Sequence, residues 1–238
     1  KNIVILILFV SFMTSCDSFL DSDNYVKKDT SNFPETSQDA LDALTGVYTV
    51  LPSVNVNQCT FLVSELLSDD RLGGGTLVDR SWGAIDQLKK VNDDMFPDFW
   101  KKMYQGIFRA NMLLETLDVV KTWENPELKD QIAAEARFLR AYFYFDLCRM
   151  FGTVPLVLTT EAVNNPRAEA KDLYAQIAED LKYAIQTLPD KKYEPKDSQL
   201  GHATKWAAES LLARVYLFYT GYYNQDALPL PDGGSVNK

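Results

Sequence analysis

One stretch, residues 131–155, constrains the fold more than any other part of this chain. Two apolar rows run along it at the spacing of three and four residues that marks a helix. The first row is Ile132, Ala136, Leu139, Phe143, Leu147 and Met150, and the second is Ala134, Phe138, Ala141, Phe145 and Cys148. Because both rows need apolar neighbours, we expect a long helix that is buried on two sides.

The end of this stretch also carries local signals. Asp146 and Arg149 are three residues apart, a spacing that lets the two side chains pair on one edge of a helix. Gly152 suits a left-handed position at the helix C-terminus, and Pro155 cannot continue the helix. Cys148 falls within an apolar row, so we expect it to be a core residue.

Four further segments show similar apolar spacing and are expected to be helices. They are residues 36–51, 99–117, 168–188 and 204–219. Thr36 or Ser37 can cap the first of them, and Trp100 is expected to pack into the core. His202 stands at the entrance to the last helix, where we expect local capping rather than chemistry. These segments predict an all-α array packed around residues 131–155.

Composition excludes several classes of function. The 33 acidic and 24 basic residues give a net charge of −9, and no basic cluster is longer than a pair such as Lys89-Lys90, so nucleic acid is not an expected partner. His202 is the single histidine, and the three cysteines lack a Cys-x-x-Cys spacing. We therefore expect no catalytic residues, no metal site and no cofactor. Whether Cys59 is free stays open.

Residues 54–98 show no sustained period, although Phe61–Leu67 can form a short helix or strand. We expect a long loop, and loops of this length usually bind something or are disordered. An aromatic ring can stack on the C–H face of a sugar while polar groups bond its hydroxyls. The candidate ligand residues in this loop are Trp82, Asp70, Arg71 and Arg80. The alternative is that Trp82 only pins the loop to the helices.

Three groups of residues resemble the signature of the SusD/RagB nutrient-binding lipoproteins of Gram-negative outer membranes. They are Glu135–Tyr142 with Phe145–Leu147 and Phe151–Val157, then Met103–Asn111, and Gly201–Lys205 with Leu211–Leu217. The resemblance implies a tetratricopeptide-like right-handed helical stack with long irregular ligand-binding loops. No clean 34-residue repeat is visible in the sequence. The family continues for about as long again, so we expect residues 38–238 to be a SusD-like N-terminal helical domain, truncated at its C-terminus.

The beginning of the chain predicts export and a lipid anchor. Ile3–Met13 is an apolar run of about eleven residues, too short for the roughly twenty that span a bilayer. Met13-Thr14-Ser15-Cys16 resembles a lipobox, so residues 1–15 are expected to be a lipoprotein signal peptide. Cys16 would carry the lipid, and residues 16–37 would form a tether. The alternative is ordinary secretory cleavage, with Cys16 incidental.

The resemblance implies a cell-surface lipoprotein of the outer membrane that is not an enzyme. It would capture oligosaccharides and deliver them to a SusC-like TonB-dependent transporter. Two alternatives stay open at this point. One is a RagB-like binder of peptides, and the other is a helical scaffold that binds only proteins. Carboxylate pairs suited to a glycosidase occur no more often than chance allows among 33 acidic residues.

Overall fold

A computed structural model describes residues 33–68, 70–73, 80–90 and 96–237 of the chain. The expected signal peptide, the expected lipidation site Cys16 and most of the expected tether lie outside the described residues. Of residues 54–58, 80 and 81, only the backbone is described.

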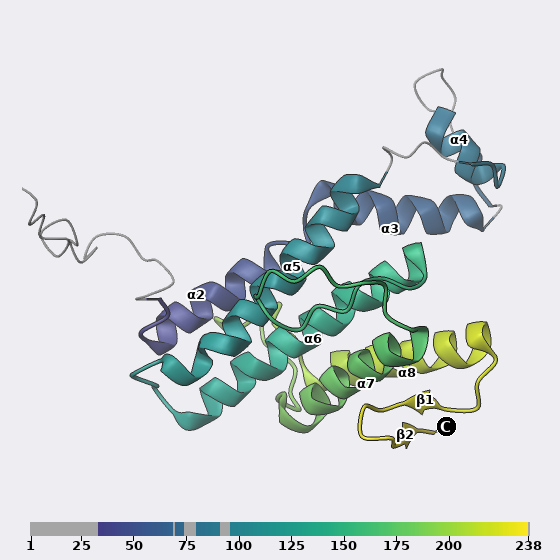
Figure 1. The fold of residues 1–238 in the computed structure, drawn as a ribbon. Coiled ribbons are helices and arrows are strands. Elements are labelled where there is room, and N and C mark those ends of the chain that lie inside the picture. Colours follow the sequence, from purple (N-terminus) through teal and green to yellow (C-terminus); the bar gives the residue numbers. More distant parts are fainter. Residues whose placement is uncertain (1–32, 69, 74–79, 91–95, 238) are drawn as a thin grey trace, which may run out of the picture. The chain divides into compact units, whose positions relative to one another are not determined.

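The described residues are almost entirely helical, which confirms the predicted all-α class (Figure 1). The helices are α2 (Ser37–Tyr48), α3 (Val54–Leu67), α4 (Arg80–Asp86), α5 (Pro97–Thr116), α6 (Pro126–Phe151), α7 (Ala170–Thr187) and α8 (Lys205–Tyr223). A 3-10 turn, η3 (Leu117–Val119), follows α5. All five predicted helices are therefore present, and their ends lie within a few residues of the expected positions. α3 and α4 were not predicted as such.

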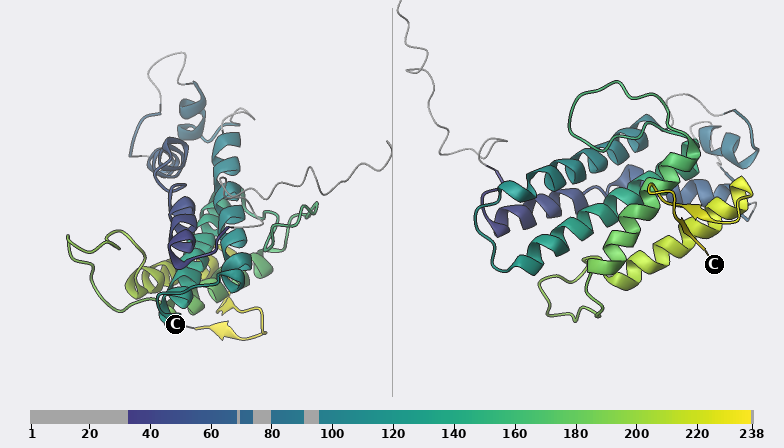
Figure 2. Two further views of the ribbon diagram at one scale, coloured as in Figure 1. Left: turned by 90° about the vertical axis from the view of Figure 1, so that its left-hand side faces the viewer. Right: turned by 60° about the horizontal axis from the view of Figure 1, so that its bottom comes forward.

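The predicted central helix is α6, and it has neighbours on both sides. It packs against α5 and α2 on one side and against α7 on the other, with α8 beyond α7 (Figures 1 and 2). Both predicted apolar rows are inside the core, and Phe143, Leu139 and Leu147 are fully buried. Cys148 is buried as expected, and Trp100 packs against the same core.

One glycine sets the distance between α5 and α6. A Cβ atom on Gly106 of α5 would lie 2.5 Å from the ring of Phe143 on α6. That ring is fully buried and cannot swing away into solvent. The absence of a side chain at position 106 therefore lets the two helices approach closely.

Most helix ends have the caps that the local sequence predicts. Thr36 caps α2 in a capping box with Asp39, and Gly152 ends α6 with a φ of 71°. Asp146 pairs with Arg149 as predicted. The capping prediction for His202 is wrong, because the side chain of Thr204 accepts the capping hydrogen bond of α8. The ring of His202 instead contacts Glu135 on α6.

The segment after α8 contains a short antiparallel hairpin. Its strands are β1 (Leu228–Pro229) and β2 (Ser235–Val236), with Leu228 opposite Val236. Leu228 is fully buried and the hairpin packs against α7 and α8. Burial of a few apolar side chains here overrides the turn-rich sequence.

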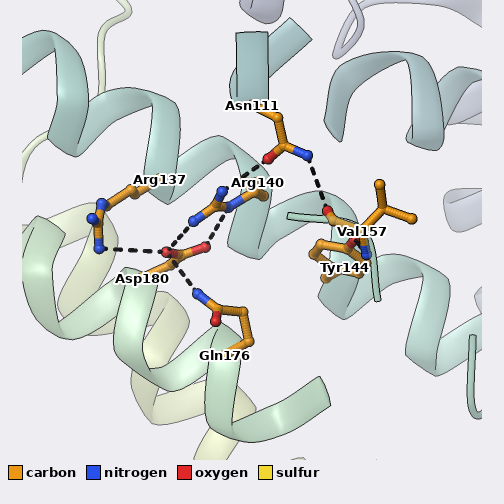
Figure 3. A network of polar contacts seen from close by, with 7 residues as sticks. All are labelled: Asn111, Arg137, Arg140, Tyr144, Val157, Gln176 and Asp180. Carbon is orange, nitrogen blue, oxygen red and sulfur yellow. Dashed lines mark hydrogen bonds and ion pairs between the residues drawn. The ribbon is translucent and has the colours of Figure 1, made fainter. Parts of the chain in front are cut away.

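A buried polar network connects the central helices (Figure 3). Arg140 on α6 makes two hydrogen bonds, of 2.8 and 2.7 Å, to the carboxylate of Asp180 on α7. It also donates to the side-chain oxygen of Asn111 on α5 at 2.8 Å. Gln176 donates to Asp180 at 3.1 Å. Each buried charge thus has hydrogen-bonded partners, which such groups require.

The same network fixes the connection between α6 and α7. The amide of Asn111 donates to the carbonyl of Val157 at 3.0 Å, and the Tyr144 hydroxyl donates to that carbonyl at 2.8 Å. Tyr104 donates to the Pro155 carbonyl at 2.7 Å. In the right-hand view of Figure 2 this connection arches away from the helices before α7 begins. Its start is therefore held by side chains of two helices, α5 and α6.

Candidate functional site

The predicted ligand residues gather around the end of α3 and the short helix α4. The expectation of a long loop over residues 54–98 is wrong, since α3 and α4 occupy much of it. On α3 the apolar residues point to several sides, so no single stripe marks the helix in the sequence. Cys59 and Leu66 are buried, whereas Phe61 on the opposite side is 56% exposed.

Two of the predicted residues, Asp70 and Arg71, directly follow α3 and are exposed. Arg71 pairs with Glu65 of α3, with 2.6 Å between its Nε and the carboxylate. The two side chains stay 62% and 34% exposed. An ion pair of this kind contributes little to stability, so its groups remain available to a polar ligand.

Close backbone packing brings this segment against α4. A Cβ on Gly73 would lie 2.6 Å from the carbonyl oxygen of Trp82, and one on Gly83 would lie 3.0 Å from the carbonyl oxygen of Gly73. Only glycine permits such an approach. The structure thus places the residues just after α3 beside the helix that carries Trp82.

Trp82 is half-buried. Among the described tryptophans, Trp100 and Trp123 pack against the main hydrophobic core, whereas Trp82 does not. Arg80 is the first residue of α4, and its side chain is outside the described part. The structure therefore brings Trp82, Asp70 and Arg71 into one region, and it places the backbone of Arg80 at the start of the helix that carries Trp82.

Sequence reasoning missed the exposed apolar side chains around these residues. Leu72 is 86% exposed, Leu88 81% and Leu67 53%. Leu88 also has a φ of 53°, a left-handed conformation that is uncommon for leucine. These leucines lie in or next to the segments that carry Asp70, Arg71 and Trp82. We call Phe61, Leu67, Asp70, Arg71, Leu72, Trp82 and Leu88 the α3–α4 surface.

The two described cysteines are buried and unreactive. Cys59 and Cys148 are free and buried. Burial raises the pKa of the Cys148 thiol to about 12, and burial followed by the nearby Asp98 raises that of Cys59. Neither thiol is a nucleophile at neutral pH. Within the described residues no cluster of three or more His, Cys, Asp or Glu side chains could hold a metal ion, and none of the helices there is long and apolar enough to cross a membrane.

Comparison with curated proteins gives distant but consistent relatives. A SusD-like protein of Formosa agariphila is 26% identical over 235 residues, which cover 91% of this chain and 43% of that protein. A SusD-like protein of Bacteroides ovatus is 29% identical over 237 residues, covering 94% and 40%. The chain thus spans about two fifths of the length of these relatives.

Solved structures agree with this relationship. A laminarin-binding SusD-like protein superposes with a TM-score of 0.67 at 28% identity, covering 85% of this chain and 46% of the other. Surface glycan-binding protein A from Bacteroides uniformis gives a TM-score of 0.69 at 25% identity, covering 79% and 43%. A family profile described as "Starch-binding associating with outer membrane" matches residues 18–217. The chain therefore belongs to the SusD-like family and has its tetratricopeptide-like helical fold.

Proposed function

We propose that this chain belongs to a cell-surface lipoprotein that binds oligosaccharides through the α3–α4 surface and delivers them to a SusC-like TonB-dependent transporter. The observation that carries the proposal is the close packing of the segment after α3 against the helix that carries Trp82, with the exposed Asp70 and Arg71 in that segment. Two structural relatives, a laminarin-binding protein and a surface glycan-binding protein, support saccharide as the ligand class.

The chemistry of this surface suits a saccharide. A sugar ring presents C–H groups on its faces and hydroxyls at its edge. The accessible part of Trp82 can take the C–H face, and Asp70 and Arg71 can accept from and donate to the hydroxyls. Because the partner of Arg71 among the described residues is the partly exposed carboxylate of Glu65, exchanging that partner for a ligand costs little. Modest affinity follows, which suits a protein that must pass its ligand on.

Calorimetry with a panel of neutral oligosaccharides and a panel of peptides tests the ligand class. We expect Trp82→Ala to weaken oligosaccharide binding at least about tenfold, as loss of an aromatic contact residue does in other complexes. Trp206→Ala is the matched control, because Trp206 on α8 is 47% exposed and is remote in sequence from the α3–α4 surface. Equal binding by both variants, or binding of peptides alone, would remove the α3–α4 surface as a glycan site.

The anchor and the partner need separate tests. A lipid on Cys16 would hold the protein at a membrane by burying methylene groups at about 0.8 kcal/mol each. Replacing Cys16 with Ala should abolish acyl labelling and release the protein from membranes, and persistent membrane attachment would contradict the anchor. Co-purification with a large outer-membrane β-barrel tests the transporter partner.

A further inference from the structure

A hollow in the described region lies far along the helices from the α3–α4 surface. It has a volume of about 480 Å³ and is bounded by α2, the start of α6 and the segment before α8. α3 contacts α5 near its beginning, where Asp98 of α5 raises the pKa of Cys59 on α3. α6, by contrast, begins after the end of α5. α5 has 20 residues, so about 30 Å of helix separates the two regions. We call this hollow the α2–α6 cavity.

Buried hydrogen bonds fix the shape of the cavity. Glu135 is 1% exposed, and its carboxylate accepts from the Tyr48 hydroxyl at 2.7 Å and from the Gln131 amide at 3.0 Å. The Nδ1 atom of His202 lies 2.8 Å from the same carboxylate. The backbone N–H of Ala203 donates to the Tyr48 hydroxyl at 2.8 Å. Three segments that are distant in the sequence are thereby held in one arrangement before any ligand arrives.

The lining of the cavity is polar, and the residues that line it include no lysine or arginine. Amide side chains of Asn125, Gln131 and Gln199 face it together with the carboxylates of Glu124 and Glu127. Amides both donate and accept hydrogen bonds, and carboxylates accept two or more. This set matches groups that also donate and accept, as hydroxyls do.

The charge of the lining excludes anions. The basic side chain in the lining, His202, is bonded to the buried carboxylate of Glu135. The exposed carboxylates Glu124 and Glu127 therefore stay uncompensated by it and repel a negatively charged ligand. The N-terminus of α6, which could otherwise attract an anion, is already capped, because the Asn125 side chain accepts from the Leu128 backbone N–H at 2.7 Å. A neutral polyhydroxylated ligand fits these groups, and the volume falls in the range of small-molecule sites, roughly 300–1,000 Å³.

We propose that the α2–α6 cavity is a second saccharide site that accepts neutral sugars of one or two rings and rejects acidic sugars. It is separate from the α3–α4 surface and does not depend on the function proposed for that surface. A protein with both sites binds one ligand at each end of α5, so a short neutral sugar binds with a stoichiometry of two.

Nitrogen-15 chemical-shift titration of the full chain tests this site. The neutral probes are maltose, cellobiose, galactose and N-acetylglucosamine, and the acidic probe is glucuronate. We expect at least one neutral probe to shift the amide signals of Gln199, Asn125 and Gln131, and glucuronate to leave them in place. The absence of such shifts with every neutral probe, or equal shifts with glucuronate, overturns the proposal.

Variants separate the two sites. Gln199→Ala should weaken binding at the cavity about fivefold, the effect of removing one hydrogen bond. Gln105→Ala is the matched control, since Gln105 is exposed on α5 and does not line the cavity. Circular dichroism verifies that each variant is folded. Trp82→Ala should leave the cavity shifts unchanged, and if it abolishes them the sugar binds at the α3–α4 surface instead. Loss of cavity shifts in Gln199→Ala alone supports the second site even where the α3–α4 surface binds nothing.

Discussion

The helical body around α6 and the α3–α4 surface are built in opposite ways. α6 buries apolar side chains on two sides and shares a fully bonded Arg140–Asp180 network with α5 and α7. In α3 and α4, the buried apolar side chains among those described are Cys59, Leu66 and Ile85, while Phe61 and Leu67 are exposed. The difference separates a part that supplies rigidity from a part that presents side chains to a ligand.

The largest expected effect concerns the buried network of the body. Asp180→Ala leaves the buried Arg140 without its carboxylate, and breaking a buried pair costs about 3–5 kcal/mol of unfolding free energy. Urea unfolding measures this loss. Asp118→Ala is the control, because Asp118 pairs with Lys129 at the surface, and it should unfold like the unchanged protein. A small loss for Asp180→Ala would show that the network is not what stiffens the body.

The close approach of α5 and α6 gives the next effect. In Gly106→Ala the new methyl group meets the buried Phe143 ring, and overpacking of this kind costs about 1–3 kcal/mol. Gly46→Ala is the matched control, since a Cβ at position 46 of α2 meets nothing within 4 Å. It should stabilise the protein by about 0.5–1 kcal/mol, because alanine favours the helix. Thermal unfolding of both variants checks that the two substitutions change stability in opposite directions. A Gly106→Ala variant as stable as the unchanged protein would mean that the two helices can move apart.

The contact between His202 and Glu135 predicts a smaller effect that depends on pH. The hydrogen bond to Glu135 raises the pKa of His202 above its ordinary 6.5, although burial acts to lower it. A raised pKa in the folded state means that the pair stabilises the protein fully below pH 6.5 and that this contribution is lost as pH rises through the folded pKa.

His202→Gln removes this titration. Unfolding free energies of the variant and the unchanged protein should therefore differ more at about pH 6 than at about pH 8.5. A difference that grows with rising pH would contradict the assigned charge of His202 in the folded protein.

Much of the body could be predicted from the sequence, and the reason is physical. The two apolar rows of α6, the Thr36 cap and the positive φ at Gly152 each depend on residues close together in the chain. The α3 helix was missed because its apolar residues serve different purposes, with Cys59 buried and Phe61 exposed, so they form no single stripe.

Contacts between residues that are distant in the sequence could not be predicted either. His202 was expected to act locally, and its partner Glu135 is 67 residues away. Of the four residues predicted to bind ligand, three lie in one region, yet Leu72 and Leu88 beside them gave no signal. The sequence alone does not distinguish an exposed leucine from a buried one, because exposure depends on the neighbours in the fold.

Hydrogen exchange followed by mass spectrometry, with and without a binding oligosaccharide, tests the central claim most directly. Without ligand, amides of α3 and α4 should exchange faster than those of α6, because fewer buried contacts hold them. With ligand, we expect protection to rise in α3 and α4 and to stay unchanged along α6. Protection that appears elsewhere while α3 and α4 are unaffected would contradict the assignment of ligand capture to the α3–α4 surface.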